Sequence, residues 1–190
     1  MKNIITYIFI TLSFSVLSQS NDEIKMMKDI NELRNDPKSF IKIVEQYIIK
    51  HEKEIDFYKK HNVKITNSSN YITNEIKISE AKKLIEELKI TQPLDTLIFS
   101  KELYIFSNIR IDTLVKNNIL SHDGFYKLSK FIKKTYICEN ISNYNKDSLL
   151  NLLLDLNSDD KDHRRNLLNS KCNNFSISIK SGMMVQIFSN

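Results

Sequence analysis

Residues 138–142 read CENIS, and two other polar fragments flank them: LSHDGF at 120–125 and DHRRNLL at 162–168. Each fragment contains a histidine or a carboxylate. No fragment is informative alone, because a single histidine or glutamate is more often a packed or solvated side chain than a functional one. Their order and spacing along one chain therefore decide how this sequence is interpreted.

The composition is that of one folded domain of ordinary size. The chain has 190 residues, which suits a single core, and 41% are hydrophobic, which excludes a disordered chain despite 27% charged residues. Two glycines are too few for a many-stranded barrel or sandwich, whose turns need positive φ. The net charge of +5 comes from basic residues interleaved with acids, so no nucleic-acid partner is expected.

Residues 1–18 have the order of a secretory signal peptide: a basic residue, an apolar run, then small residues. The run is shorter than the ~20 residues that a membrane-spanning helix needs. We therefore expect cleavage near Ser18 or Ser20 and no stable membrane anchor. The mature protein would be a single domain over 19–190, secreted to an extracellular or periplasmic space.

Export affects how Cys138 and Cys172 are interpreted. Thiols tend to oxidise outside the cytosol, and two cysteines allow one pairing. A disulfide would close a loop of about 35 residues and stabilise the fold by roughly 3–4 kcal/mol. The alternative is two buried free thiols that pack as small apolar residues.

Helical periodicity dominates the first part of the chain, starting with apolar residues at 27, 30 and 33. Asp36 followed by Pro37 predicts a helix start there, and Ser79 and Ser100 are predicted to cap two later helices. Residues 59–75 are polar and weakly periodic, which predicts an exposed loop.

In the later part of the chain the spacing of the apolar residues changes. Asp147 opens a leucine-rich segment that predicts a short buried helix. Phe175, Ile177 and Ile179 then alternate with polar residues ahead of a Ser-Gly turn at 181–182, which predicts a hairpin. Helices first and antiparallel strands late indicate an α+β domain, with helices packed on a small sheet.

Four polar side chains stand at the ends of the expected elements: His122, Glu139, Asp155 and His163. Imidazole and carboxylate are usual ligands of Zn²⁺, and three such ligands with an open position make a catalytic site. The same four could instead act as acid and base, with a carboxylate orienting each imidazole. His122 and His163 are the candidate metal ligands, for Zn²⁺ or another divalent ion.

The ordered fragments LSHDGF, ENIS and DHRRNLL, closed by MVQIF at 184–188, resemble the CAP superfamily of cysteine-rich secretory, antigen 5 and pathogenesis-related proteins. The likeness is greatest to bacterial SCP-like extracellular proteins. INELRNDPKSF at 30–40 and TQPLDTLIFSKEL at 91–103 resemble the family's opening helix and the approach to its long helix. The resemblance implies a three-layer α-β-α sandwich around a small, mainly antiparallel sheet, with a cleft of two histidines and two acids.

Carried onto this sequence, the resemblance makes His122 and His163 the cleft histidines and Glu139 the first acid. Asp155 is the candidate for the second acid. Its competitors follow it in the chain: Asp159, Asp160 and Asp162. Asn140 and Arg164 match motif positions and would support the cleft. The sequence also departs from the family, since Cys138 replaces the glycine usual before ENI and the common tryptophan is missing.

Because the family has no uniform reaction, the resemblance implies a secreted, non-covalent binding module. Its cleft would take a divalent metal or a small-molecule, lipid or protein ligand. The alternative is a metal-assisted, peptidase-like hydrolase, although the sequence has neither a GxSxG nor an HExxH motif. A third option is a polar cluster that only stabilises the fold. His51 and His61 lie among charged residues and are expected to be solvated, outside the site.

Overall fold

The computed structural model describes residues 18–61, 73–156, 158 and 160–190. Asp159, nearly all of the predicted signal peptide and most of the predicted loop at 59–75 lie outside the described residues. Within those ranges, no helix is both long and apolar enough to cross a membrane.

A four-stranded sheet lies at the centre of the molecule. Its strands are β1 (Ile98–Phe99), β2 (Ile137–Asn143), β3 (Asn174–Lys180) and β4 (Met183–Ser189), in the spatial order β1-β3-β4-β2. The predicted hairpin is confirmed: β3 and β4 are antiparallel, and both turn residues, Ser181 and Gly182, have positive φ. A two-residue turn of that kind matches the twist of the strands. β2 pairs antiparallel with β4, and β1 pairs parallel with β3.

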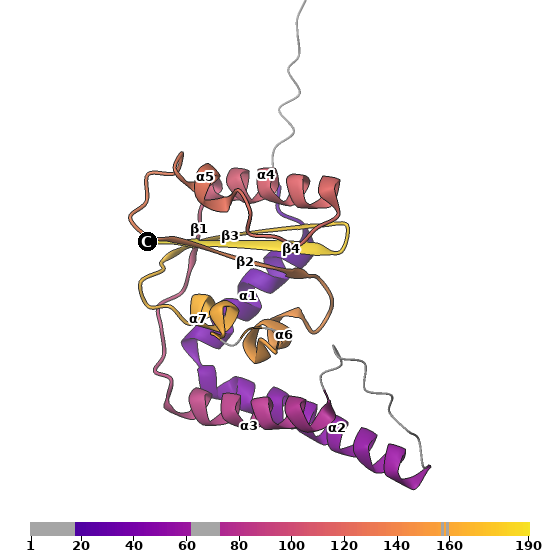
Figure 1. The fold of residues 1–190 in the computed structure, drawn as a ribbon. Helices are drawn as coiled ribbons and strands as arrows, with labels where there is room; N and C mark the ends of the chain where they lie inside the picture. Colours follow the sequence, from indigo (N-terminus) through magenta and orange to yellow (C-terminus); the bar gives the residue numbers. More distant parts are fainter. Residues whose placement is uncertain (1–17, 62–72, 157, 159) are drawn as a thin grey trace, which may run out of the picture.

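Helices cover both faces of the sheet, so the predicted α+β class and three-layer order are confirmed (Figure 1). α4 (Lys101–Asn117) and α5 (Phe125–Ser129) lie on one face; α1 (Asn21–Asn35), α6 (Ser148–Leu154) and α7 (Asp162–Leu167) lie on the other. Each face has its own apolar core, one built on Leu103 and Val185 and the other on Leu153 and Phe175.

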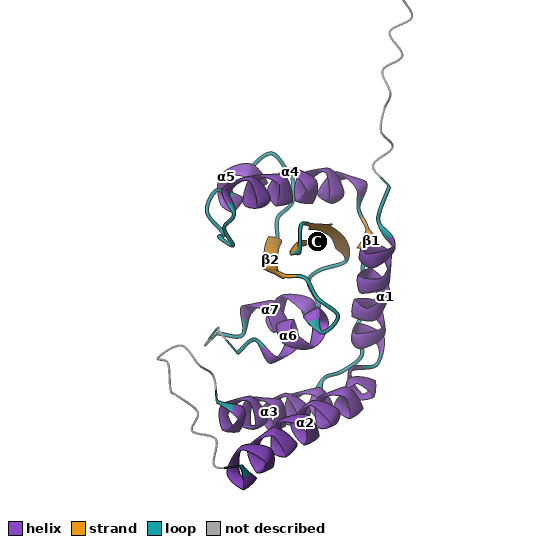
Figure 2. Ribbon diagram, turned by 90° about the vertical axis from the view of Figure 1, so that its right-hand side faces the viewer, coloured by secondary structure: helices purple, strands orange, loops and turns teal. Residues whose placement is uncertain are grey.

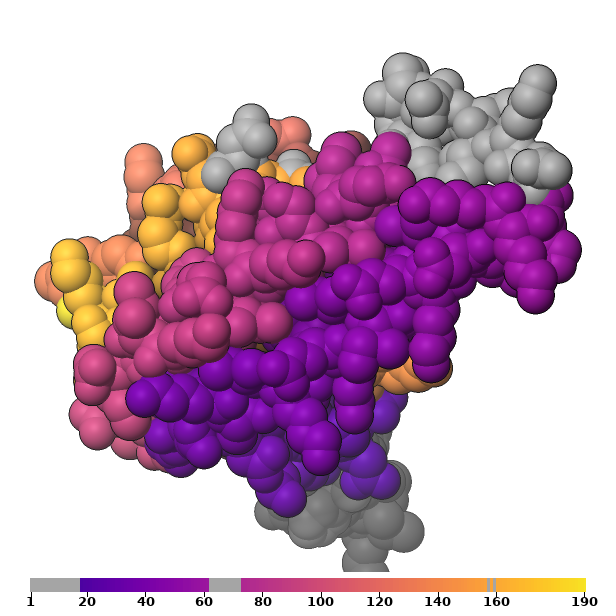
Figure 3. Space-filling view, turned by 90° about the horizontal axis from the view of Figure 1, so that it is seen from below, coloured from indigo at the N-terminus to yellow at the C-terminus, as the bar shows by residue number. Residues whose placement is uncertain are grey.

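A helical pair packs beyond α6, outside this three-layer arrangement. The 3-10 turn η1 (Pro37–Phe40) leads into α2 (Ile41–Lys60), which packs on α3 (Asn74–Ile90). Figure 2 shows α1 running along one side of the molecule from the sheet to this pair. Figure 3 shows that α2 and α3 cover the bottom of the molecule.

Two expectations for this helical pair were wrong. α3 begins at Asn74, because Thr73 accepts a hydrogen bond from the Ile76 N–H and serves as the N-cap; Ser79 lies inside the helix. His51 is buried, not solvated. Its Nδ1 lies 2.9 Å from a Glu54 carboxylate oxygen and 3.1 Å from the Asn74 side-chain oxygen, so it joins α2 to α3.

The strand that contains CENIS has no counterpart among the predicted elements. In β2 the polar residues Glu139 and Asn140 are buried side by side, ahead of the buried Ile141. A strand with polar side chains turned to both faces lacks the alternation by which strands are recognised. The partners that satisfy these side chains determine the functional geometry.

Candidate functional site

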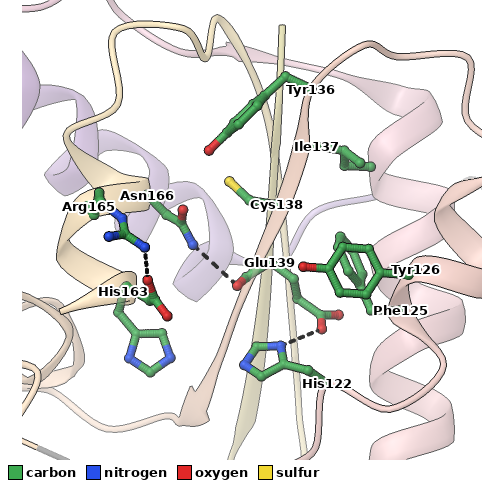
Figure 4. A pocket seen from close by; sticks show the side chains of 11 residues that line it. His122, Phe125, Tyr126, Tyr136, Ile137, Cys138, Glu139, His163, Arg165 and Asn166 are labelled. Atoms are coloured by element: carbon green, nitrogen blue, oxygen red, sulfur yellow. Dashed lines mark hydrogen bonds and ion pairs between the residues drawn. The ribbon is translucent and has the colours of Figure 1, made fainter. Parts of the chain in front are cut away.

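A cavity of about 350 Å³ lies beside β2, one of the two edge strands of the sheet. In Figure 4, α7 with His163 borders it on one side, α5 with Tyr126 borders it on the other, and β2 lies between them. His122, which precedes α5, and Glu139 of β2 line the same cavity. The structure thus brings together three of the four residues singled out in the sequence.

His122 is held by Glu139. The His122 Nδ1 lies 3.0 Å from the Glu139 Oε2; the histidine side chain is 56% exposed, whereas the carboxylate is 1% exposed. A carboxylate only accepts hydrogen bonds, so Nδ1 carries a proton, and in the neutral ring Nε2 keeps its lone pair. That lone pair points away from Glu139 and is available to a ligand.

Arg110 of α4 completes this arrangement, and the sequence analysis missed it. Its Nε and Nη2 donate to the two oxygens of Glu139 at 2.7 and 3.0 Å. Its guanidinium also donates to the carbonyls of Ser121 and Asp123 at 2.8 and 3.1 Å. Arg110 therefore balances the buried charge of Glu139 and fixes the backbone on both sides of His122.

One sequence signal could have identified Arg110. It lies on the buried face of α4, where it shares a helical spacing with Leu103, Ser107 and Leu114. A charged residue at such a position is almost never fully buried without a partner of opposite charge. The partner itself is far along the chain, so the pattern does not name it.

Asp155 holds the second histidine from behind. Its Oδ1 lies 2.8 Å from the His163 Nδ1, and its Oδ2 accepts the His163 backbone N–H at 2.9 Å. Asp155 ends α6 in the left-handed conformation, at φ 46°, which aspartate tolerates better than most residues. It is buried and lies behind His163 rather than on the cavity wall.

The pKa of Asp155 reflects these contacts. Burial alone would raise it. The hydrogen bonds from the His163 ring and backbone, with the electrostatic influence of His163 and Lys161, outweigh burial and hold the pKa of Asp155 below its ordinary value. The carboxylate is therefore ionised and orients the imidazole.

The competing acids have other positions. Asp162 borders the cavity but forms an exposed ion pair with Arg165. Asp160 lines a separate hollow with Lys161 and Arg164. Asp159 is outside the described residues. Among the described acids of this segment, Asp155 alone forms a hydrogen bond with a cleft histidine.

The two supporting residues have different roles. Asn140 lies between β2 and α7: its Nδ2 donates to the His163 carbonyl at 3.2 Å, and its Oδ1 accepts from Asn166 at 2.8 Å. Arg164 lines a hollow on the α3 side, where its Nε lies 3.3 Å from a Glu87 carboxylate oxygen. Asn166 was also missed by the sequence analysis, although it belongs to the DHRRNLL motif.

Cys138 and Cys172 are both free thiols in the structure, joined by a hydrogen bond. That bond and burial raise the pKa of Cys138, which also borders the cavity. The same bond, helped by the charge of Arg34, lowers the pKa of Cys172 even though burial opposes it. The predicted disulfide therefore stays a prediction, now between neighbouring thiols.

The cavity offers fewer metal ligands than the sequence suggested. Among the described residues, no three His, Cys, Asp or Glu side chains are grouped so that they could share an ion. Glu139 and Asp155 are each engaged with an imidazole Nδ1, the arrangement usual behind metal-binding histidines. The Nε2 atoms of His122 and His163 are the available ligands.

Comparisons with known proteins give limited matches. No family model matches the chain, and no curated protein matches it. Similar solved structures include an extracellular protein containing an SCP domain from Bacillus anthracis, with 19% identity, a TM-score of 0.44 and coverage of 61% of this chain. Another is a cysteine-rich secretory protein from Staphylococcus aureus, with 20% identity, a TM-score of 0.43 and coverage of 59%. This chain spans 39% and 37% of the lengths of those two proteins. The terms SCP domain and cysteine-rich secretory protein, which describe them, also belong to the family that the sequence motifs resemble.

Proposed function

We propose that this chain is a secreted, CAP-type binding protein whose cleft holds a divalent transition-metal ion between His122 and His163. The proposal is supported by one arrangement that both histidines share. Each imidazole lines the same cavity while its Nδ1 is bonded to a buried carboxylate, at 3.0 Å for His122 and 2.8 Å for His163.

A carboxylate at Nδ1 fixes the tautomer and makes Nε2 a better ligand. Imidazole suits Zn²⁺, Cu²⁺ and Ni²⁺, whereas Mg²⁺ and Ca²⁺ prefer oxygen. Two imidazoles leave coordination positions open. Water or donor atoms of a bound small molecule or peptide would fill them, so the ion would link the protein to its ligand.

Binding is a better proposal than hydrolysis. A catalytic zinc site uses three protein ligands and one open position, and the described cleft supplies two imidazoles. Cys138 borders the cavity, but its raised pKa makes it a poor nucleophile.

Calorimetric titration of the mature protein with Zn²⁺ tests the proposal. The wild type should bind one equivalent, and the His122→Ala/His163→Ala variant should lose that binding. His61→Ala is the matched control, because His61 is exposed at the end of α2 and outside the cavity. Absence of binding by the wild type, or equal loss in the control, would refute the metal site.

Secretion is part of the same proposal. Ser20 caps α1 in a reciprocal capping box with Glu23, and the Ser18 carbonyl accepts a hydrogen bond from Tyr104. Cleavage after Ser18 keeps the cap, whereas cleavage after Ser20 removes it. We therefore expect the exported chain to begin at Gln19. Mass spectrometry of the exported protein would reveal this start; retention of the full-length chain inside the cell would refute secretion.

A further inference from the structure

α5 and the loop that follows it each expose one aromatic side chain: Tyr126, which lines the cavity, and Phe131. Phe131 is 82% exposed, the highest value for a large hydrophobic side chain among the described residues, and Tyr126 is 75% exposed. Their neighbours Phe125 and Ile132 are buried in the core below α4. The buried neighbours anchor the segment, so the two exposed aromatic rings project from a fixed base.

The same segment is purely basic. Residues 124–137 contain Lys127, Lys130, Lys133 and Lys134 and no acidic residue. No ion pair with a described residue is found for any of the four, whereas Lys25, Lys83, Lys89 and Lys180 each pair with a carboxylate. Elsewhere in the chain the basic residues are interleaved with acidic ones. In this segment the four lysines are close together in the sequence and form no ion pair with a described residue.

We propose that this surface, which we name the aromatic–lysine rim (residues 125–134), docks on an anionic lipid surface. Aromatic side chains are favoured at the headgroup level of a membrane, and lysines are attracted to anionic lipids. A partner that binds both the two exposed aromatic rings and the lysines around them must accommodate apolar groups and carry negative charge. The interface of an anionic membrane offers both, whereas a soluble polyanion engages only the lysines.

Docking through this rim would orient the cavity toward the membrane. Tyr126 belongs to both the rim and the cavity wall (Figure 4). The segment from α5 to β2 lies at the outer edge of the molecule in Figure 1, and its residues Lys130, Phe131 and Lys133 are exposed. The proposal does not depend on metal binding, because neither histidine takes part in it.

The absence of tryptophan from the chain provides a direct assay. Phe131→Trp would place one reporter on the rim, and Phe57→Trp would place one on α2, where Phe57 is 55% exposed. With vesicles containing phosphatidylglycerol, the emission of the Phe131→Trp protein should shift to the blue. The Phe57→Trp protein should not change. Equal shifts, or no shift at position 131, would overturn the proposal.

Sedimentation with the same vesicles separates the two components of the rim. Phe131→Ser and Lys130→Glu/Lys133→Glu should each weaken binding at least tenfold, and added salt should weaken it further. Lys59→Glu/Lys60→Glu, on exposed positions of α2, is the matched charge control and should bind as the wild type does. If only the lysine variant loses binding, the rim is a general polyanion site and the lipid proposal fails. Equal binding to uncharged phosphatidylcholine vesicles would also refute it.

Discussion

Replacing Arg110 with methionine tests how the cleft is held together. Methionine keeps much of the buried volume but removes the charge that faces Glu139. The side chains of Arg110 and Glu139 are each 1% exposed, so the substitution leaves a buried carboxylate without its positively charged partner. Breaking a buried ion pair by removing one partner costs about 3–5 kcal/mol. For a domain of this size, that corresponds to a fall in Tm of roughly 6–20 °C.

The assay is urea and thermal unfolding, with Arg165→Met as the matched control. Arg165 is also paired with a carboxylate, but the pair is exposed, so its removal should cost about 0.5 kcal/mol or less. The double variant Arg110→Met/Glu139→Leu should recover most of the lost stability, because it also removes the unpaired buried charge. It should not recover metal binding, because His122 then lacks its carboxylate. A cost below about 1 kcal/mol for Arg110→Met would refute the reasoning.

Further predictions concern Asp155 and the cysteines. Because the folded pKa of Asp155 is lowered, its contribution to stability is present above the unfolded value near 3.9 and is lost as pH falls through the folded value. Unfolding free energy should therefore drop more steeply with acid in the wild type than in Asp155→Asn; parallel curves would contradict this. The same variant should bind Zn²⁺ about 10–100-fold more weakly, since the orientation of His163 is lost, while Asp162→Asn should not. Oxidation should join Cys138 to Cys172 and raise stability by roughly 3–4 kcal/mol, a change measured by unfolding with and without reductant. Two free thiols after oxidation, by mass spectrometry, would refute the pairing.

The fold was predictable where the signals were local. Ser100 does cap α4, because its hydroxyl accepts the backbone N–H of Leu103, three residues ahead. Asp147 does precede a short buried helix, and Phe175 and Ile177 do alternate along the first strand of the hairpin. In each case the residues that determine the structure are neighbours in the sequence.

The features that the sequence did not predict depend on contacts between residues that are far apart in the chain. β2 was missed because Asn140 looks unsuited to a buried strand until the Gln186 side chain, which accepts its hydrogen bond, is known. His51 looked solvated because its partner Asn74 belongs to another helix. The candidate cleft shows the same division: motif order indicated His122, Glu139 and His163, but nothing local to the motifs indicated Arg110.

The position of the cavity at the edge strand has a structural consequence. An edge strand exposes backbone groups that invite pairing with other chains. In β2 that liability is reduced by α7, since the Asn166 side chain donates to the backbone carbonyl of Glu139 at 3.4 Å. Asn140 makes the reciprocal link to the His163 carbonyl. The contacts that protect the edge are thus the ones that position His163.

The two histidines consequently come from opposite layers of the sandwich. His122 follows α4 on one face of the sheet, and His163 opens α7 on the other; β2 connects them. A ligand that bridges both imidazoles would tie the two layers together and favour the folded chain by mass action. At a hundredfold excess over its Kd, Zn²⁺ should stabilise the wild type by about 2.7 kcal/mol. The single variants His122→Ala and His163→Ala should each lose that stabilisation, because one imidazole reaches only one layer. If either single variant kept the full gain, the ion would bind one layer alone and the bridge would be wrong.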